Sequence, residues 1–215
     1  MVDLPIVALL PAIFAALKTD EQVILQAPPG AGKSTYLPLK LLQDNLVSGR
    51  ILMLEPRRLA TRNIAQFMAS QLNEKVGQQV GYRMRGDSKV SAATRLEVVT
   101  EGILLRMMQQ DPELSGYDLI IFDEFHERSL HADMGLAFAL EIQQGLRDDL
   151  KLLVMSATLD SEKLQKLLPE AQVLTSEGRG FPITYSYHAP NLQGRSLNQA
   201  MIPAVVNAVQ LALQE

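Results

Sequence analysis

The residues with the clearest chemical potential form a short glycine-rich loop near the N-terminus. The loop reads Ala27, Pro28, Pro29, Gly30, Ala31, Gly32, Lys33, Ser34 and then Thr35. Gly30 and Gly32 let the backbone turn its amide groups toward one point, and such a nest of N–H groups binds anions. Lys33 could reach the β and γ phosphates of a nucleotide, and the Ser34 hydroxyl could bind Mg²⁺. The loop therefore predicts a nucleotide-phosphate site.

Two features of this loop differ from the strict pattern GxxxxGKS. Ala27 stands in place of the first glycine, and Pro29 has no amide hydrogen to donate. An ordinary glycine-rich turn between a strand and a helix is the simpler alternative, but it does not explain the GKS ending. Kinases, transporters and GTPases use similar loops, so the class of enzyme has to come from other residues.

A second group of reactive side chains follows an apolar run at residues 119–122. It reads Asp123, Glu124, Phe125 and His126. Open α/β sheets bind ligands at the carboxyl ends of their strands, which is where these carboxylates should lie. Asp123 and Glu124 are candidate Mg²⁺ ligands together with Ser34, and Glu124 could also deprotonate an attacking water. The alternative is an acidic helix N-terminus that is stabilised by the helix dipole.

The same segment also invites comparison with zinc proteases, because His126 and Glu127 are followed by His131. The protease pattern is HExxH, whereas the spacing here is HExxxH. On a helix, two histidines five residues apart differ by about 140° and point away from each other. We therefore do not expect the two histidines to share a zinc ion.

The elements that must position these residues show an alternating pattern. Short apolar runs, expected to be strands buried on both faces, lie at 23–26, 51–54, 96–99, 119–122, 152–155 and 173–174. Helix-like spacing of apolar residues lies between them, at 34–42, 58–72, 102–110, 134–144 and 161–168. This alternation predicts an α/β fold with a parallel sheet covered by helices on both faces.

Composition sets the size and setting of this fold. The chain has 215 residues, of which 47% are hydrophobic, enough for the core of one domain. There is no cysteine, which excludes disulfides and agrees with a reducing, cytoplasmic location. No segment reaches the roughly 20 apolar residues of a membrane span. The net charge of −4 argues against binding nucleic acid by bulk charge, so such binding would be local.

The two ends of the chain differ from its middle. Residues 4–17 are apolar but contain two prolines and lack a basic leader, so we expect a short helix rather than a signal peptide. We expect one domain over residues 1–178 and a linker rich in glycine and proline over 179–195. Residues 196–214 then read as one helix, and we interpret residues 196–215 as the start of a truncated second domain.

Several motifs together resemble those of superfamily 2 helicases of the DEAH type, and in particular the bacterial HrpB-type helicases. The resemblance rests on the loop 27–34, the DEFH box 123–126, Ser156-Ala157-Thr158, and segments 55–60, 80–83, 100–102 and 145–160. These segments occur in order and extend over most of the chain. Phe125 departs from the DEAH box, which has alanine at that position.

The resemblance implies a RecA-like first motor domain that uses ATP and Mg²⁺. Lys33, Ser34, Asp123 and Glu124 would bind and hydrolyse MgATP. His126 and the run Ser156-Ala157-Thr158 would couple the nucleotide state to strand movement. Arg57, Arg58 and Thr100 would contact the backbone of single-stranded nucleic acid, with RNA implied by the family. A second RecA-like domain would supply an arginine finger, so this chain alone should hydrolyse ATP very slowly.

Simpler interpretations of these residues remain open. Arg57 and Arg58 could form surface ion pairs, and Ser156 and Thr158 could cap the next helix. At the level of function, the alternatives are an enzyme that transfers phosphate to a small acceptor and a protein that uses ATP only as a switch. These residues do not determine whether the strand is RNA or DNA. They also do not determine the preferred nucleotide or the oligomeric state.

Overall fold

The computed structural model describes residues 4–157, 161–176, 185–190, 194 and 196–213. The chain divides into two compact units, Met1–Arg179 and Gly180–Glu215. All of the candidate residues for chemistry belong to the larger, N-terminal unit.

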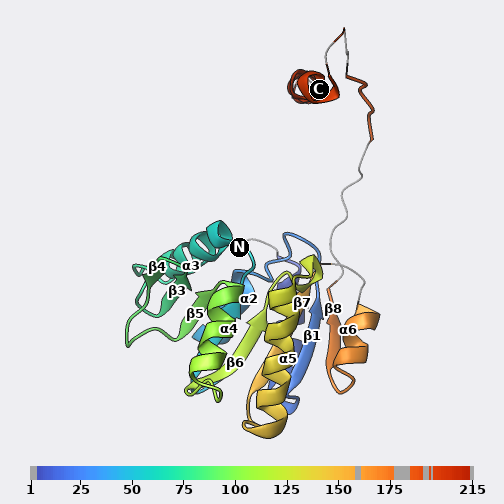
Figure 1. Ribbon diagram of the computed structural model, residues 1–215. Helices are drawn as coiled ribbons and strands as arrows, with labels where there is room; N and C mark the ends of the chain where they lie inside the picture. Colours follow the sequence, from blue (N-terminus) through green and yellow to red (C-terminus); the bar gives the residue numbers. More distant parts are fainter. Residues whose placement is uncertain (1–3, 158–160, 177–184, 191–193, 195, 214–215) are drawn as a thin grey trace. The chain divides into compact units, whose positions relative to one another are not determined.

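The larger unit alternates strands and helices as the sequence predicts, except that β3, β4 and β5 follow one another without a helix between them (Figure 1). Its strands are β1 (Gln22–Gln26), β2 (Arg50–Leu54), β3 (Val80–Met84), β4 (Asp87–Lys89), β5 (Leu96–Val99), β6 (Tyr117–Phe122), β7 (Lys151–Ser156) and β8 (Gln172–Thr175). Its helices are α1 (Ile6–Thr19), α2 (Tyr36–Gln43), α3 (Arg58–Gln71), α4 (Glu101–Gln110), the 3-10 helix η1 (Phe125–Glu127), α5 (Leu130–Gly145) and α6 (Ser161–Leu167).

These strands form one sheet in the order β4-β3-β5-β2-β6-β7-β1-β8. Every neighbouring pair is parallel except β3 and β4. The predicted parallel sheet is therefore confirmed for its central strands and wrong at one edge. There, a two-residue turn containing Gly86 (φ +80°) joins β3 to β4, and the Tyr82 hydroxyl donates to Asp87. Neither β3 nor the short, polar β4 is among the predicted apolar runs, so the sequence analysis missed both strands.

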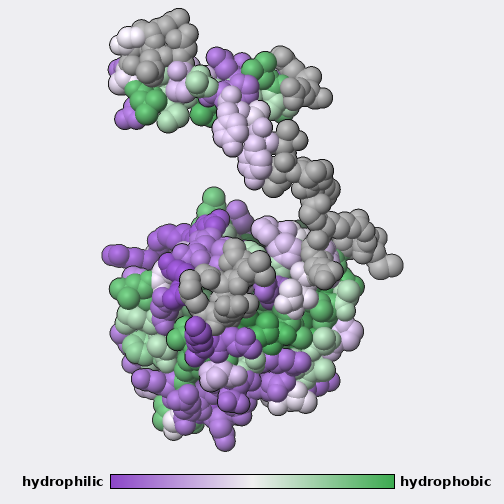
Figure 2. All heavy atoms as spheres, turned by 90° about the vertical axis from the view of Figure 1, so that its right-hand side faces the viewer, coloured by the Kyte–Doolittle hydropathy of each residue, from purple (hydrophilic) through white to green (hydrophobic). Residues whose placement is uncertain are grey.

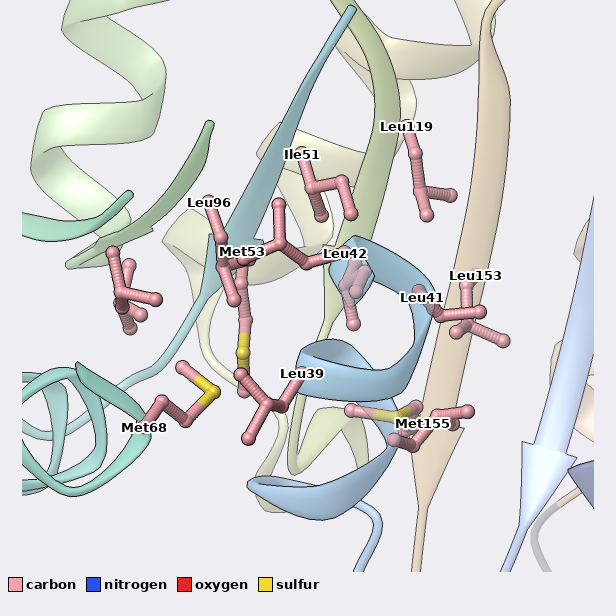
Figure 3. Close-up of a cluster of buried hydrophobic side chains, with 14 of the residues drawn as sticks. Leu39, Leu41, Leu42, Ile51, Met53, Met68, Leu96, Leu119, Leu153 and Met155 are labelled. Atoms are coloured by element: carbon pink, nitrogen blue, oxygen red, sulfur yellow. The ribbon is translucent and has the colours of Figure 1, made fainter. Parts of the chain in front are cut away.

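Two hydrophobic clusters cover the opposite faces of the sheet. Along β1, Val23 and Leu25 pack with α1, α2 and α3, whereas Ile24 between them packs with α4, α5 and α6. Successive strand residues point to opposite faces, so an unbroken apolar run serves both clusters. Figure 3 shows the first cluster, where Leu41 of α2 and Met68 of α3 approach the strands. In Figure 1, α4 and α5 lie side by side over the second face.

The starts of two helices differ from the prediction. Helix α2 begins at Tyr36 instead of residue 34, so Ser34 and Thr35 belong to the loop. Helix α5 begins at Leu130, four residues before the predicted start. The Ser129 side chain accepts a hydrogen bond from the Ala132 amide and so caps this earlier turn.

The C-terminal unit contains one described helix, α7 (Leu197–Ala212), close to the predicted 196–214. Ser196 and Gln199 form a capping box at its start. Ala200 is the only buried residue among those described in α7, and Figure 2 shows hydrophobic residues on the surface of this unit. Residues 185–190, in the predicted linker, form neither helix nor strand. No described helix is long and apolar enough to cross a membrane.

Candidate nucleotide site and nucleic-acid interface

The glycine-rich loop connects the end of β1 to α2. The Ala27 amide donates to the Ser156 carbonyl at 3.0 Å, which joins the loop to the end of β7. Gly30 (φ +77°) and Gly32 (φ +95°) both adopt the left-handed conformation that favours glycine. A Cβ atom at Gly32 would also lie 3.0 Å from the Ile6 side chain. Both glycines are therefore required by the backbone, as the prediction of an anion-binding turn assumed.

Lys33 lies at the centre of the candidate nucleotide site. Its side chain is only 3% exposed, and its Nζ atom lies 3.0 Å from Oε1 of Glu124. The loop after β1 and the box after β6 are thus in direct contact, although 91 residues separate the two side chains in the sequence. Both residues line a cavity of about 950 Å³. The loop contributes Pro29, Gly30, Gly32, Ser34 and Thr35 to the same cavity.

Asp123 is the most buried carboxylate of the box. Its pKa is raised to about 6, chiefly by burial and also by the charge of Glu124, although the Ser34 hydroxyl and Lys33 act to lower it. Its Oδ1 atom accepts from the Glu124 amide at 2.9 Å, whereas its buried Oδ2 has no hydrogen-bond partner among the described residues. A buried carboxylate oxygen beside a hydroxyl is the kind of oxygen pair that Mg²⁺ binds. Asp123 and Ser34 therefore fit the predicted Mg²⁺ site.

Glu124 and His126 connect the box to the loop after β7. Glu124 has φ +50°, a left-handed conformation that costs a residue other than glycine about 1–2 kcal/mol. The Nδ1 atom of His126 lies 3.3 Å from Glu124 Oε2 and 3.3 Å from the Ala157 amide, from which it accepts a hydrogen bond. Ser156 is the last residue of β7, five residues before α6 begins at Ser161. Thr158 lies outside the described residues.

The two histidines considered as zinc ligands do not share a helix. His126 belongs to η1, whereas His131 lies in the first turn of α5, and Arg128 between them has φ +46°. The angular argument assumed one continuous helix, and that assumption is wrong. Among the described residues, no group of three or more histidine, aspartate or glutamate side chains is arranged to hold a metal ion.

Two residues of this region were not predicted as functional. Glu55, at the end of β2, is 3% exposed, and burial together with the charges of Asp123 and Glu124 raises its pKa to about 7. Phe67 of α3 is 50% exposed and lines the cavity beside the glycine-rich loop. An acidic residue that directly follows an apolar strand was a visible signal for Glu55. Phe67 gave no signal, because it resembles any apolar residue of an amphipathic helix.

The candidate nucleic-acid contacts lie at the ends of the adjacent strands β2 and β5. Arg57 precedes α3 and forms an ion pair with Glu127, so the simpler alternative of a surface ion pair is present here. Arg58 instead donates to the Arg85 carbonyl at 2.9 Å. Thr100 precedes α4 without capping it through its side chain. The structure thus places these three residues along one edge of the sheet, beside the box.

Comparison with known proteins identifies what this arrangement is similar to. The family model described as DEAD/DEAH box helicase matches residues 11–167. The ATP-dependent RNA helicase HrpB of Escherichia coli (strain K12) is 62% identical over 187 residues, which are 87% of this chain and 23% of that protein. The probable ATP-dependent RNA helicase DHR2 of Saccharomyces cerevisiae is 38% identical over 178 residues, 81% of this chain and 24% of that protein.

A solved structure agrees with these sequence matches. The crystal structure of Escherichia coli DEAH/RHA helicase HrpB matches with a TM-score of 0.91 and 55% identity, covering 99% of this chain and 27% of that chain. The chain thus spans about a quarter of the length of these relatives. The match confirms the RecA-like α/β fold that the motifs implied.

Proposed function

Because this chain belongs to the DEAD/DEAH box helicase family, we propose that it is the ATP-binding first motor domain of a DEAH-type ATP-dependent RNA helicase. One observation carries this proposal. The Lys33 ammonium of the glycine-rich loop lies 3.0 Å from Glu124 of the box, beside a buried Asp123 whose Oδ2 atom lacks a hydrogen-bond partner among the described residues. A cation for phosphate, an oxygen for Mg²⁺ and a carboxylate base therefore meet at one edge of the sheet.

Each of these groups has a distinct part in binding MgATP. The loop amides and Lys33 would hold the β and γ phosphates, and the phosphate oxygens would replace Glu124 as the partner of Lys33. Asp123 and Ser34 would hold Mg²⁺, which neutralises charge on the phosphates when it is bound. The released Glu124 carboxylate could then orient a water molecule. Phosphate binding and activation of the base are thereby linked through one ion pair.

The proposed reaction is hydrolysis of the terminal phosphate. Glu124 takes a proton from the attacking water as the water oxygen bonds to the γ phosphorus. The bond from that phosphorus to the β–γ bridging oxygen breaks, which leaves ADP and inorganic phosphate. Lys33 stabilises the charge that develops on the phosphate oxygens. His126, between Glu124 and the Ala157 amide, would transmit the change to the loop after β7.

The same cavity offers a place for the nucleoside. Beyond the loop it is lined by Tyr36 of α2 and by Phe67 and Gln71 of α3. Aromatic rings bind nucleobases by stacking with little preference for the base. We place the base against Phe67, with the phosphates on the glycine-rich loop. This assignment supplies the base contact that sequence patterns alone did not indicate.

The nucleic-acid track and the second domain belong to the same proposal. Arg57, Arg58 and Thr100 would contact the phosphate backbone, and the names of the relatives support RNA as the strand. We interpret residues 179–195 as the linker and α7 as the start of a second RecA-like domain. That domain would supply an arginine finger, which is worth about 10³ to 10⁵ in rate. A cytoplasmic location remains a prediction.

The proposal is tested by measuring MgATP binding and slow turnover by the 215-residue chain. Glu124→Gln should retain binding of a fluorescent ATP analogue and lose turnover, because the amide cannot take the proton of water. Glu141→Gln, at an exposed position on α5, is the matched control and should retain both. Turnover that requires a small acceptor would instead support a phosphotransferase. Full turnover by Glu124→Gln would contradict the assignment of the base.

A further inference from the structure

Arg57, one of the two arginines proposed to contact nucleic acid, already has an acidic partner within the chain. The Arg57 guanidinium faces the Glu127 carboxylate through two contacts, Nη2 with Oε1 and Nε with Oε2, the latter at 3.4 Å. The Arg57 side chain is 66% exposed, so a phosphate could reach it. A phosphate that approaches Arg57 therefore meets a neutralised pair instead of a free cation.

The two partners belong to the two halves of the site. Arg57 lies between β2 and α3, and its amide donates to Oε1 of Glu55, the buried carboxyl next to Asp123. Glu127 is the last residue of η1, which also contains Phe125 and His126 of the box. One side-chain pair thus connects the nucleic-acid edge to the segment that holds the proposed base.

That segment, residues 124–128, depends on contacts to keep its shape. Glu124 (φ +50°) and Arg128 (φ +46°), at its two ends, both have a positive φ. Residues other than glycine adopt this conformation at a conformational cost and retain it only when their surroundings determine it. The contacts to Lys33, to the Ala157 amide and to Arg57 all act on this segment. The loss of one of them should change how firmly the segment is held.

From these observations we propose that Glu127 competes with nucleic-acid phosphate for Arg57, so that binding of the strand removes one contact from segment 124–128. This inference rests on the proposed function. Carboxylate and phosphate both accept paired hydrogen bonds from the same guanidinium edge, so they exclude each other there. An exposed ion pair contributes little to stability, and the competition can therefore be measured without unfolding the protein. Glu127 is then a positioning residue, not a catalytic one.

Binding of a short fluorescein-labelled oligouridylate, followed by fluorescence anisotropy at low salt, tests the competition. Glu127→Gln should tighten binding roughly 2- to 5-fold, the range that corresponds to releasing an exposed ion pair. The matched control is Asp133→Asn. It removes an equal charge from the Arg128–Asp133 pair, and it should change affinity by less than about 1.5-fold because Asp133 does not compete for Arg57.

The double variant separates competition from general electrostatics. In an Arg57→Ala background, Glu127→Gln should no longer tighten binding, because the contested cation is gone. A gain that persists there, or one equalled by Asp133→Asn, would overturn the inference. If Arg57→Ala binds RNA as well as the original chain does, the proposed RNA contact itself fails. If Arg57→Ala weakens binding but Glu127→Gln does not tighten it, only the competition fails.

The link to the nucleotide is tested by reciprocity. If RNA acts on segment 124–128 through Arg57 and Glu127, RNA should change the affinity for a fluorescent ATP analogue, and ATP should change RNA affinity by the same factor. In Glu127→Gln this factor should move toward one, while in Glu141→Gln, at an exposed position on α5 outside the segment, it should be retained. An unchanged factor in Glu127→Gln would show that the pair does not transmit the signal.

Discussion

The two halves of the site use charge in opposite ways. At the ends of β1, β6 and β7, the nucleotide half holds Lys33 and Asp123 almost fully buried. At the ends of β2 and β5, the nucleic-acid half presents Arg57 and Arg58 to solvent. A buried charge is costly unless it is paired, whereas an exposed charge is hydrated and screened. Single substitutions should therefore have large effects in the first half and small, cumulative effects in the second.

The largest effect is expected for Lys33→Ala. Removing one partner of a buried charge pair at a binding site costs about 2–5 kcal/mol, so affinity for a fluorescent ATP analogue should fall roughly 30-fold or more. Lys18→Ala, at an exposed position at the end of α1, is the control and should bind normally. Titration by fluorescence measures both variants. Equal affinity in the two variants would show that the glycine-rich loop is not the phosphate site.

The next effect concerns Glu55, whose pKa rises from 4.5 to about 7 on folding, chiefly through burial. The native state therefore binds this proton more tightly than the unfolded chain. Above about pH 7 the carboxyl is charged in both states, and folding carries the cost of burying it. This cost is removed as the pH falls from about 7 to 4.5.

Glu55→Gln should consequently raise the free energy of unfolding by about 1–3 kcal/mol at mildly alkaline pH. This gain in stability should decline as the pH falls from about 7 to 4.5 and should be absent at lower pH. Urea denaturation over a series of pH values measures this difference, with Glu141→Gln as the exposed control. A pH-independent difference would mean that the buried charge is not its cause.

A smaller effect is expected at the open end of the nucleotide cavity, where Phe67 is half exposed. Stacking of a base on an aromatic ring contributes about 1–3 kcal/mol, and exposure places Phe67 at the lower end of this range. Phe67→Ala should weaken ATP binding about 5-fold and leave inorganic tripolyphosphate unaffected, because tripolyphosphate has no base. Competition titrations against a fluorescent ATP analogue compare the two ligands. Equal weakening of both would place the base elsewhere.

The smallest effect is expected for Arg58→Ala in the exposed half. Loss of one phosphate contact should weaken RNA binding a few-fold at low salt and reduce the slope of log affinity against log salt by about 0.7. Arg106→Ala, which removes an exposed charge from α4, should leave this slope unchanged. Anisotropy titrations over a range of salt concentrations measure both slopes. If Arg58→Ala lost as much RNA affinity as Lys33→Ala loses ATP affinity, the exposed half would not differ from the buried half in the way described.

Local sequence was sufficient to predict the parts of the site that are contiguous in the chain. The loop 27–34 and the box 123–126 each combine their reactive groups within a few residues, and each follows an apolar run. The two features on which phosphate binding by the loop depends are the left-handed conformation of its glycines and the charge of its lysine. Both could be predicted from residue type. The same holds for the central strands of the sheet, whose apolar runs can only be buried on both faces.

The remaining features depend on residues that are far apart in the sequence. The strand β4 has no apolar pattern and forms because β3 lies beside it. Glu127 meets Arg57 from 70 residues away, and the burial of Glu55 beside the carboxylates of the box raises its pKa. No local pattern specifies such contacts, since each depends on which strands become neighbours.

The sequence by itself therefore determined the fold class, the phosphate loop, the acidic box and the family to which they point. These properties reside in residue types at short spacing, where backbone conformation and burial follow directly. The tertiary structure alone decided that Lys33 faces Glu124, that Phe67 lines the nucleotide cavity and that Glu127 holds Arg57. These contacts and the lining of the cavity depend on the strand order, because it brings segments that are distant in the sequence to one edge of the sheet.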